Sequence, residues 1–212
     1  MSKTKVHQRY YQKDGTHVPG STTILGILDK PALLNWAWEL GMKGEDFRKV
    51  RDKAADIGTI AHYLIECHLT GETPDLADYS PANVEKAENA VIAYFDFEKA
   101  HGLKMIFSEK QLVSEKYPYG GTIDCYAELD GKPSLLDFKT SKGVYPEMKV
   151  QVASYAELLK EHGHQVESVH ILQINKETGE FVHHRMGDLT EEWELFKVLA
   201  QAYPIKQRVW KR

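Results

Sequence analysis

"GTIDCYAELDGKPSLLDFKTS", residues 121–141, contains two strand-like runs on either side of Asp130-Gly131. An Asp-Gly pair between alternating strands is the strongest short-range signal for a hairpin, and it favours a two-residue type I′ turn. That turn places Leu129 opposite Lys132 and thereby fixes which residues face each other along both strands. A one-residue bulge at Pro133 would shift this register and is the alternative to it.

In the unshifted register, one face of the hairpin is apolar and the other carries two facing carboxylates. Asp124 lies opposite Asp137, and Lys139 follows on the same face because strand side chains alternate. Like charges directly opposite each other destabilise a sheet. A hard divalent cation between the carboxylates, Mg²⁺ or Mn²⁺, would remove the repulsion. The apolar face would pair Ile123 with Phe138 and Cys125 with Leu136.

Further polar residues are spaced so that they could join the same centre. His62 and Glu66 are four residues apart in "DIGTIAHYLIE" and share one face of an expected helix. Gln151 and Tyr155 have the same spacing in "QVASY", on the helix after the hairpin. Each of these pairs alone is also typical of ordinary packed or surface residues. An ammonium at Lys139 could orient an attacking water or neutralise charge on a phosphate in the transition state.

The rest of the chain has a helical N-terminal half followed by alternating strands and helices. After an N-terminal hairpin around Asp14-Gly15, we expect helices over about 31–44, 45–69 and 81–100. Strands are expected near 104–114, 120–129, 134–139, 167–175 and 180–186, and helices near 146–162 and 189–202. This order predicts an α/β fold: a mixed sheet flanked by helices and wrapped by an N-terminal helical layer. Residues 1–102 would form the hairpin and helical layer and 103–212 the core, together one structural domain.

Composition excludes several classes of protein. The 212 residues carry 27 basic and 31 acidic side chains, a net charge of −4, which is not the signature of a basic nucleic-acid coat protein. Two cysteines cannot supply the four thiolates of an iron–sulfur cluster. The sequence has no apolar run of membrane-spanning length, and we expect a cytoplasmic location. Both ends are locally basic, and they carry Lys3, Lys5, Arg9 and Lys13, and Lys206, Arg208, Lys211 and Arg212.

The ordered set of motifs closely resembles the PD-(D/E)XK nuclease superfamily. The set comprises the "GTID" that ends in Asp124, the "DFK" of residues 137–139 and the Gln151–Tyr155 helix. With His62 upstream, the set is similar to the RecB-like branch and to its stand-alone phage-type exonucleases. The resemblance spans residues 58–155, and each motif is short. Members of the branch that hold an iron–sulfur cluster use four cysteines, and this sequence departs from them.

This resemblance implies a restriction-endonuclease-like core and divalent-metal-dependent hydrolysis of phosphodiester bonds. The implied metal ligands are Asp124, Asp137, the carbonyl of Phe138, His62 and Glu109, with Glu115 as the alternative to Glu109. Lys139 would be the catalytic lysine. Gln151 and Tyr155 would support catalysis or contact substrate, and Thr140 and Ser141 would contact substrate. One or two Mg²⁺ or Mn²⁺ ions would be the cofactor.

Three functions remain open on this basis. The first is an exonuclease acting at ends of single- or double-stranded DNA in recombination, repair or phage DNA processing. A single-strand-binding or annealing protein would be a suitable partner for it. The second is a structure-specific or restriction-type endonuclease, and the third a catalytically silent DNA-binding module of the same fold. The five other histidines of the C-terminal half, at 162, 164, 170, 183 and 184, fit surface or strand-edge positions better than a metal cluster.

Overall fold

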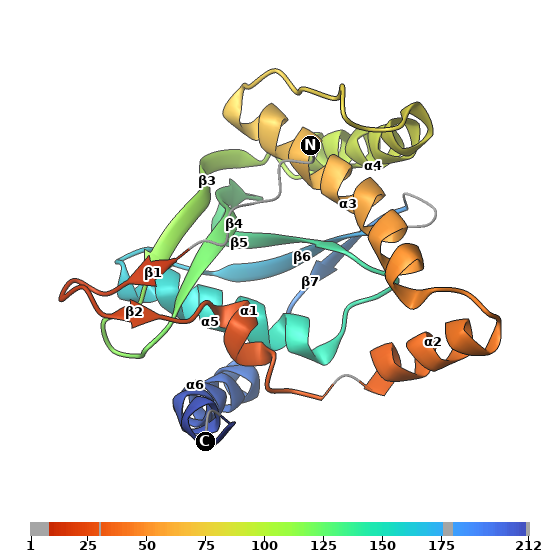
Figure 1. Ribbon diagram of the computed structural model, residues 1–212. Helices are drawn as coiled ribbons and strands as arrows, with labels where there is room; N and C mark the ends of the chain where they lie inside the picture. Colours follow the sequence, from red (N-terminus) through yellow and green to blue (C-terminus); the bar gives the residue numbers. More distant parts are fainter. Residues whose placement is uncertain (1–8, 30, 176–179, 211–212) are drawn as a thin grey trace.

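A computed structural model describes residues 9–29, 31–175 and 180–210 and shows a five-stranded mixed sheet between two helical layers (Figure 1). The strands lie in the order β3-β4-β5-β6-β7; β5 and β6 pair in parallel and the other neighbours are antiparallel. The predicted mixed sheet flanked by helices is therefore confirmed. The strands are β3 (Lys104–Val113), β4 (Gly120–Leu129), β5 (Lys132–Thr140), β6 (Ser168–Ile174) and β7 (Phe181–Arg185).

Helices cover both faces of the sheet, and the N-terminal helices are divided between them. The long helices α3 (Phe47–Thr70) and α4 (Pro81–Ala100) pack on one face. The short helix α1 (Ser21–Leu25) instead packs on the opposite face with α5 (Pro146–Glu161) and α6 (Thr190–Trp210). A hydrogen bond from Ser21 Oγ to the Gly120 carbonyl holds α1 at the start of β4, so α3 and α4 form the N-terminal helical layer on their face of the sheet without α1.

Local signals in the sequence set most of the element ends. Asp46 caps α3 by accepting a bond from the N–H of Arg48, and Gly71 ends that helix with a φ of 74°. Helix α6 differs from the expected 189–202, because it continues through Pro204 to Trp210. The remaining elements are α2 (Pro31–Met42) and the hairpin of β1 (Tyr10–Tyr11) and β2 (His17–Val18). None of the helices in the described part of the chain is long and apolar enough to cross a membrane.

The β4–β5 hairpin has the predicted turn and register. Asp130 and Gly131 have φ values of 51° and 73°, as a type I′ turn requires of its two central residues. Pairing runs from Leu129↔Lys132 to Cys125↔Leu136, and Glu128↔Pro133 keeps the same register. Pro133 therefore introduces no bulge.

Beyond Cys125 the two strands separate, which the sequence did not predict. The ladder ends at Cys125↔Leu136, one pair before Asp124 and Asp137 would meet. Ile123 belongs to the core between the sheet and α5, whereas Phe138 belongs to the core beneath α3 and α4. The predicted pairing of these two side chains on one apolar face is therefore wrong.

Candidate metal centre

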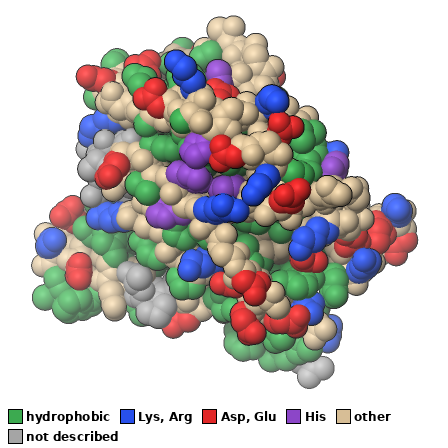
Figure 2. Space-filling view, turned by 180° about the vertical axis from the view of Figure 1, so that it is seen from behind, with side chains coloured by type: hydrophobic (Ala, Val, Ile, Leu, Met, Phe, Trp, Pro, Cys, Tyr) green, Lys and Arg blue, Asp and Glu red, His purple; other side chains and the backbone are tan. Residues whose placement is uncertain are grey.

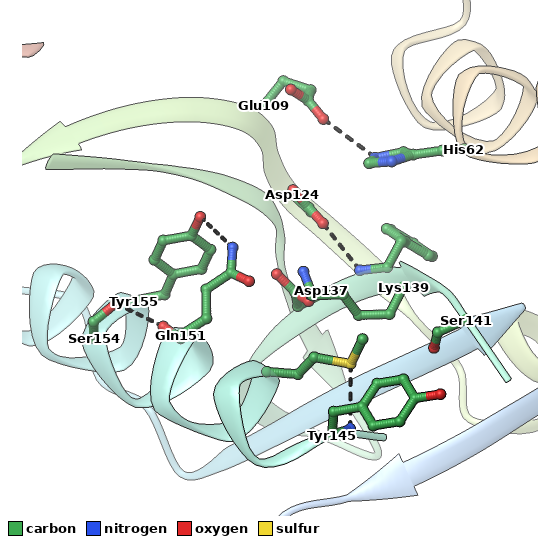
Figure 3. A network of polar contacts seen from close by, with 12 residues as sticks. His62, Glu109, Asp124, Asp137, Lys139, Ser141, Tyr145, Gln151, Ser154 and Tyr155 are labelled. Carbon is green, nitrogen blue, oxygen red and sulfur yellow. Dashed lines mark hydrogen bonds and ion pairs between the residues drawn. The ribbon is translucent and has the colours of Figure 1, made fainter. Parts of the chain in front are cut away.

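Three ligand-type side chains converge where β4 and β5 separate. His62 comes from α3, Glu109 from β3 and Asp124 from β4, and one donor atom of each lies within 4.8 Å of the other two. His62 Nε2 is 3.4 Å from Glu109 Oε1. Figure 3 shows His62 and Glu109 facing each other above Asp124. The structure thus joins the N-terminal helical half to the sheet at one polar centre.

Glu109 has an unusual backbone conformation. Its φ is 47°, and the other non-glycine residue with a positive φ among the described ones is Asp130, in the hairpin turn. A side-chain-bearing residue in the left-handed region costs about 1–3 kcal/mol, and such residues cluster at functional sites. The neighbouring residues keep the ladder, with Ser108↔Cys125 and Lys110↔Ile123 in pairing register. The conformational free energy cost is therefore confined to Glu109, the residue whose carboxylate faces His62.

A close contact between helix and strand brings His62 to the sheet. A Cβ added at Gly58 would lie 1.9 Å from the side chain of Thr140, so a glycine is needed where α3 crosses the end of β5. His62 follows one helical turn later and its ring packs against that of Phe138, with centroids 5.5 Å apart. Thr140, predicted to contact substrate, therefore lies beneath α3.

Asp137 and Lys139 form a buried ion pair beside this centre. Lys139 Nζ lies 2.5 Å from Asp137 Oδ2, and Asp137 is 0% exposed. Within the described residues, neither carboxylate oxygen has a hydrogen-bond partner besides this ion pair. Asp137 lies outside the His62–Glu109–Asp124 group, so its place as a ligand of the same metal stays a prediction.

Burial and neighbouring charges act on both members of the pair. Burial raises the pKa of Asp137, Lys139 opposes that shift, and Asp124 adds to it by repulsion. Burial alone would lower the pKa of Lys139, but the carboxylates of Asp137 and Asp124 outweigh it and the pKa is raised. Lys139 is therefore an ammonium at neutral pH while these carboxylates are ionised, and it places a positive charge beside them.

Gln151 and Tyr155 form the side of the site built by α5. Gln151 Nε2 donates a 2.7 Å hydrogen bond to the Tyr155 hydroxyl, and both side chains are buried. Burial raises the pKa of Tyr155 well above its usual value, and Asp137 and Asp124 raise it further. Tyr155 therefore stays protonated. The close packing of its ring on Gly121 leaves no room there for a Cβ, which would approach the ring to 2.5 Å.

The two remaining predicted site residues, Phe138 and Ser141, each make a defined hydrogen bond. The N–H of Phe138 donates to Asp124 Oδ2 at 2.9 Å. In an extended strand a residue's N–H and C=O point to the same side, so the Phe138 carbonyl is directed into the gap beside β4. Ser141 is buried, and its hydroxyl donates to the Gly143 carbonyl at 2.7 Å. That bond fixes the loop after β5.

The residues present suit a hard divalent cation. Carboxylate oxygens and a neutral imidazole match the preferences of Mg²⁺ and Mn²⁺, and Mn²⁺ accepts the nitrogen more readily. The carboxylate of Asp137 is buried with one cationic partner and no hydrogen bonds from the described residues, which is an incomplete environment for a charged group. A cation would complete this environment and relieve the repulsion between Asp137 and Asp124.

Two features of the structure were not predicted. Tyr10, from the N-terminal hairpin, packs on Gly120 and shares a 3.0 Å hydrogen bond with Thr122, two residues before Asp124. His170 and His183 form a 2.8 Å hydrogen bond on β6 and β7, and His170 is 4% exposed, so the expectation of surface or strand-edge roles is wrong for it. Both contacts join distant segments, and no local spacing signals them.

Comparisons with known proteins add a distant likeness of fold. No protein-family model and no curated protein matches the chain. Among solved structures, it is similar to a "Putative exonuclease" from Eubacterium rectale, with 14% identity, a TM-score of 0.48 and coverage of 67% of this chain and 64% of that chain. It is also similar to SSO0001, with 16% identity, a TM-score of 0.38 and coverage of 61% and 62%. The chain thus spans less than two thirds of the length of either protein. At these scores neither likeness contributes to the assignment of function.

Proposed function

We propose that this protein is a metal-dependent deoxyribonuclease of the PD-(D/E)XK type, in its RecB-like branch. The observation that carries the proposal is the convergence of His62, Glu109 and Asp124 beside the buried Asp137–Lys139 pair. These residues come from a helix and three strands, and they combine the oxygen-rich ligands and the cation that phosphodiester hydrolysis requires. A purely structural role does not explain why two carboxylates gather around one imidazole beside a third carboxylate that is buried.

Each residue has a distinct role in this proposal. His62, Glu109, Asp124, Asp137 and the Phe138 carbonyl would hold one or two Mg²⁺ or Mn²⁺ ions. When bound, such an ion supplies Lewis acidity and lowers the pKa of its water. Lys139 holds a positive charge beside Asp137, where it can bind a phosphate oxygen and orient the attacking water. The hydrogen bond between Gln151 and Tyr155 fixes the α5 side of the site.

We further propose that the enzyme acts at DNA ends. Helix α3 crosses the end of β5 and covers one side of the centre, which favours a strand end over the middle of a continuous duplex. The net charge is −4, so the phosphates need local positive surface, and the basic termini would provide it. Of those residues, Lys3, Lys5, Lys211 and Arg212 lie outside the described residues.

Digestion of labelled DNA tests this function directly. Linear duplex, linear single strand and covalently closed circles would each be incubated with Mg²⁺, Mn²⁺ or EDTA. The proposal expects metal-dependent release of short products from linear DNA, no cleavage in EDTA, and little sequence preference. Binding should weaken steeply with salt, on a slope set by the number of phosphates engaged.

The alternatives give different products. Rapid nicking of closed circles with discrete products would identify an endonuclease and overturn the preference for ends, while the proposed catalytic residues would stand. DNA binding without cleavage under any metal would identify a silent binding module. A protein that neither binds nor cleaves DNA under any of these conditions would refute the proposed function as a whole.

A further inference from the structure

The outer face of α6 carries a continuous apolar stripe. Leu195, Val198, Ile205 and Val209 are 42%, 61%, 53% and 54% exposed, and Ala202 lies between them in the sequence. These five positions are spaced three, four, three and four residues apart, which is the heptad spacing of a helix seam that packs against another helix. Isolated exposed apolar residues are common, but four exposed ones in register, with the half-buried Ala202 among them, form a surface.

This stripe is separate from the face that holds α6 to the protein. Phe196, Leu199 and Ala200 are buried in the core that α6 shares with α5. The stripe therefore remains exposed after the helix has docked. Figure 2 shows hydrophobic side chains gathered along the lower edge of the molecule, where Figure 1 places α6.

Charges along α6 indicate which partner fits the stripe and in which direction. Over 190–198 the helix carries Glu191, Glu192, Glu194 and Lys197, a formal charge of −3 + 1 = −2. Over 202–210 it carries Lys206 and Arg208, a formal charge of +2. A second α6 laid antiparallel places each acidic half beside the basic half of its partner. A parallel copy would place like charges together.

We propose that α6 pairs antiparallel with α6 of a second copy of this chain, forming a two-fold symmetric dimer. A two-fold axis near the middle of the helix makes the stripe complementary to itself, because the same residues are contributed from both sides. Glu194 already pairs with Lys197 at 2.7 Å, so the attraction between copies arises from the halves as a whole rather than from one ion pair. The proposal is independent of the metal centre.

The dimensions of the contact suggest a moderate affinity. A 21-residue helix is about 31 Å long, so two of them give one elongated contact without a large surrounding interface. Interfaces of that size are at the small end of specific complexes. We therefore expect association over a protein concentration range of about 1–100 μM.

Molecular mass in solution tests the dimer. Light scattering or sedimentation of the full chain should show a rise from 24.2 kDa toward twice that mass with increasing concentration. Ile205→Glu places a charge in the stripe and should weaken association at least tenfold. Ile92→Glu is the matched control, because Ile92 is a 58% exposed apolar residue on α4, outside the stripe, and its change should leave the mass unchanged.

Charge reversal tests the direction of pairing. Glu192→Lys with Glu194→Lys should weaken an antiparallel dimer at least tenfold, and adding Lys206→Glu with Arg208→Glu should restore it. In a parallel pair the two Glu→Lys changes would only replace repulsion between two acidic halves by repulsion between two basic halves. A monomer at all concentrations, or a dimer that tolerates Ile205→Glu, overturns the proposal; a dimer insensitive to the charge changes overturns the antiparallel arrangement. Circular dichroism of each variant confirms that it is folded.

Discussion

Asp124 Oδ2 accepts a 2.9 Å hydrogen bond from the N–H of Phe138, at the point where β4 and β5 stop pairing. Just beyond the last backbone pair of this ladder, the N–H of Phe138 thus donates its hydrogen bond to a side-chain carboxylate. The bond fixes Asp124 at the opening between the strands, beside His62 and Glu109. One member of the polar centre, Asp124, is therefore held by a hydrogen bond at the position where the pairing of β4 and β5 ends.

Asp137→Asn should abolish cleavage and leave DNA binding intact. Loss of the charge removes a proposed metal ligand and also a group that repels phosphate, so binding should stay equal or tighten. We expect the rate to fall by about 1000-fold or more, which corresponds to about 4 kcal/mol in the activation barrier. Rates measured with labelled DNA, together with affinities from fluorescence anisotropy, check this. A parallel loss of binding and cleavage would instead indicate misfolding or a role of Asp137 in DNA binding.

Glu109→Gln should lower activity, and Glu115→Gln should not. Glu109 lies 3.4 Å from His62, whereas Glu115 lies beyond the C-terminal end of β3 and accepts a 3.0 Å bond from the N–H of Lys13. Replacement of a group that orients or holds a metal ligand typically costs about 10–100-fold in activity or metal affinity. Cleavage rates across a titration of Mn²⁺ measure both. Equal effects of the two substitutions would remove Glu109 from the site.

His62→Ala should weaken activity with Mn²⁺ more than activity with Mg²⁺. Imidazole nitrogen suits Mn²⁺ better than Mg²⁺, so its loss removes more of the affinity for Mn²⁺. Rates in each metal, and the metal concentration that gives half the maximal rate, report the change. An unchanged preference with normal rates would make His62 an ordinary residue of α3.

Gly58→Ala should destabilise the contact between α3 and β5. The added methyl would meet the side chain of Thr140 at 1.9 Å, and forcing extra atoms into a packed contact typically costs about 1–3 kcal/mol. Gly41→Ala, on α2, meets nothing within 4 Å and should be neutral or slightly stabilising. Denaturant unfolding of both variants gives the comparison. Thr140→Gly combined with Gly58→Ala should recover part of the loss.

The histidine pair on β6 and β7 should make stability depend on pH. The pKa of His170 is lowered to about 4, mainly by burial. Repulsion from His183, Arg185 and His101 also lowers it, and Asp130 opposes the shift. The unfolded chain, with a histidine pKa of about 6.5, then binds more protons than the folded one. The stabilisation is complete above about pH 6.5 and is lost as the pH falls toward 4, by about 1–2 kcal/mol after solvent screening.

Unfolding free energies measured between pH 4 and pH 7 check this dependence. His170→Asn should flatten part of the slope, because it removes the titrating group. The exposed His17, changed to Asn, serves as the control and should leave the slope unchanged. A slope that survives in His170→Asn would assign the effect to other groups.

The turn was the most predictable part of the fold. Asp130-Gly131 specifies positive φ at both positions, and that alone fixed the register as far as Cys125. The separation of the strands at Asp124 was not predictable, because it depends on a bond between a side chain and the backbone of a different strand. The left-handed conformation of Glu109 likewise has no local signal, since glutamate gives no indication of a positive φ.

The candidate site was predictable in its residues more than in its geometry. His62, Glu109 and Asp124 were each singled out by motif or resemblance, and the structure brings these three together. Asp137 was expected to face Asp124 but pairs with Lys139. Short-range patterns determine which side chains share a face of one element. The position at which two strands separate depends on packing between segments far apart in the chain. The same is true of the helix that crosses the strands.

The seating of α3 on Thr140 through Gly58 also has a consequence for how the protein would lose activity. His62 reaches Glu109 and Asp124 only while α3 is docked, whereas the strands hold each other through their own ladders. Undocking of this one helix would dismantle the centre without melting the sheet. In rising denaturant, inactivation should therefore precede the loss of β-structure, and amide protons of α3 should exchange before those of β5 and β6.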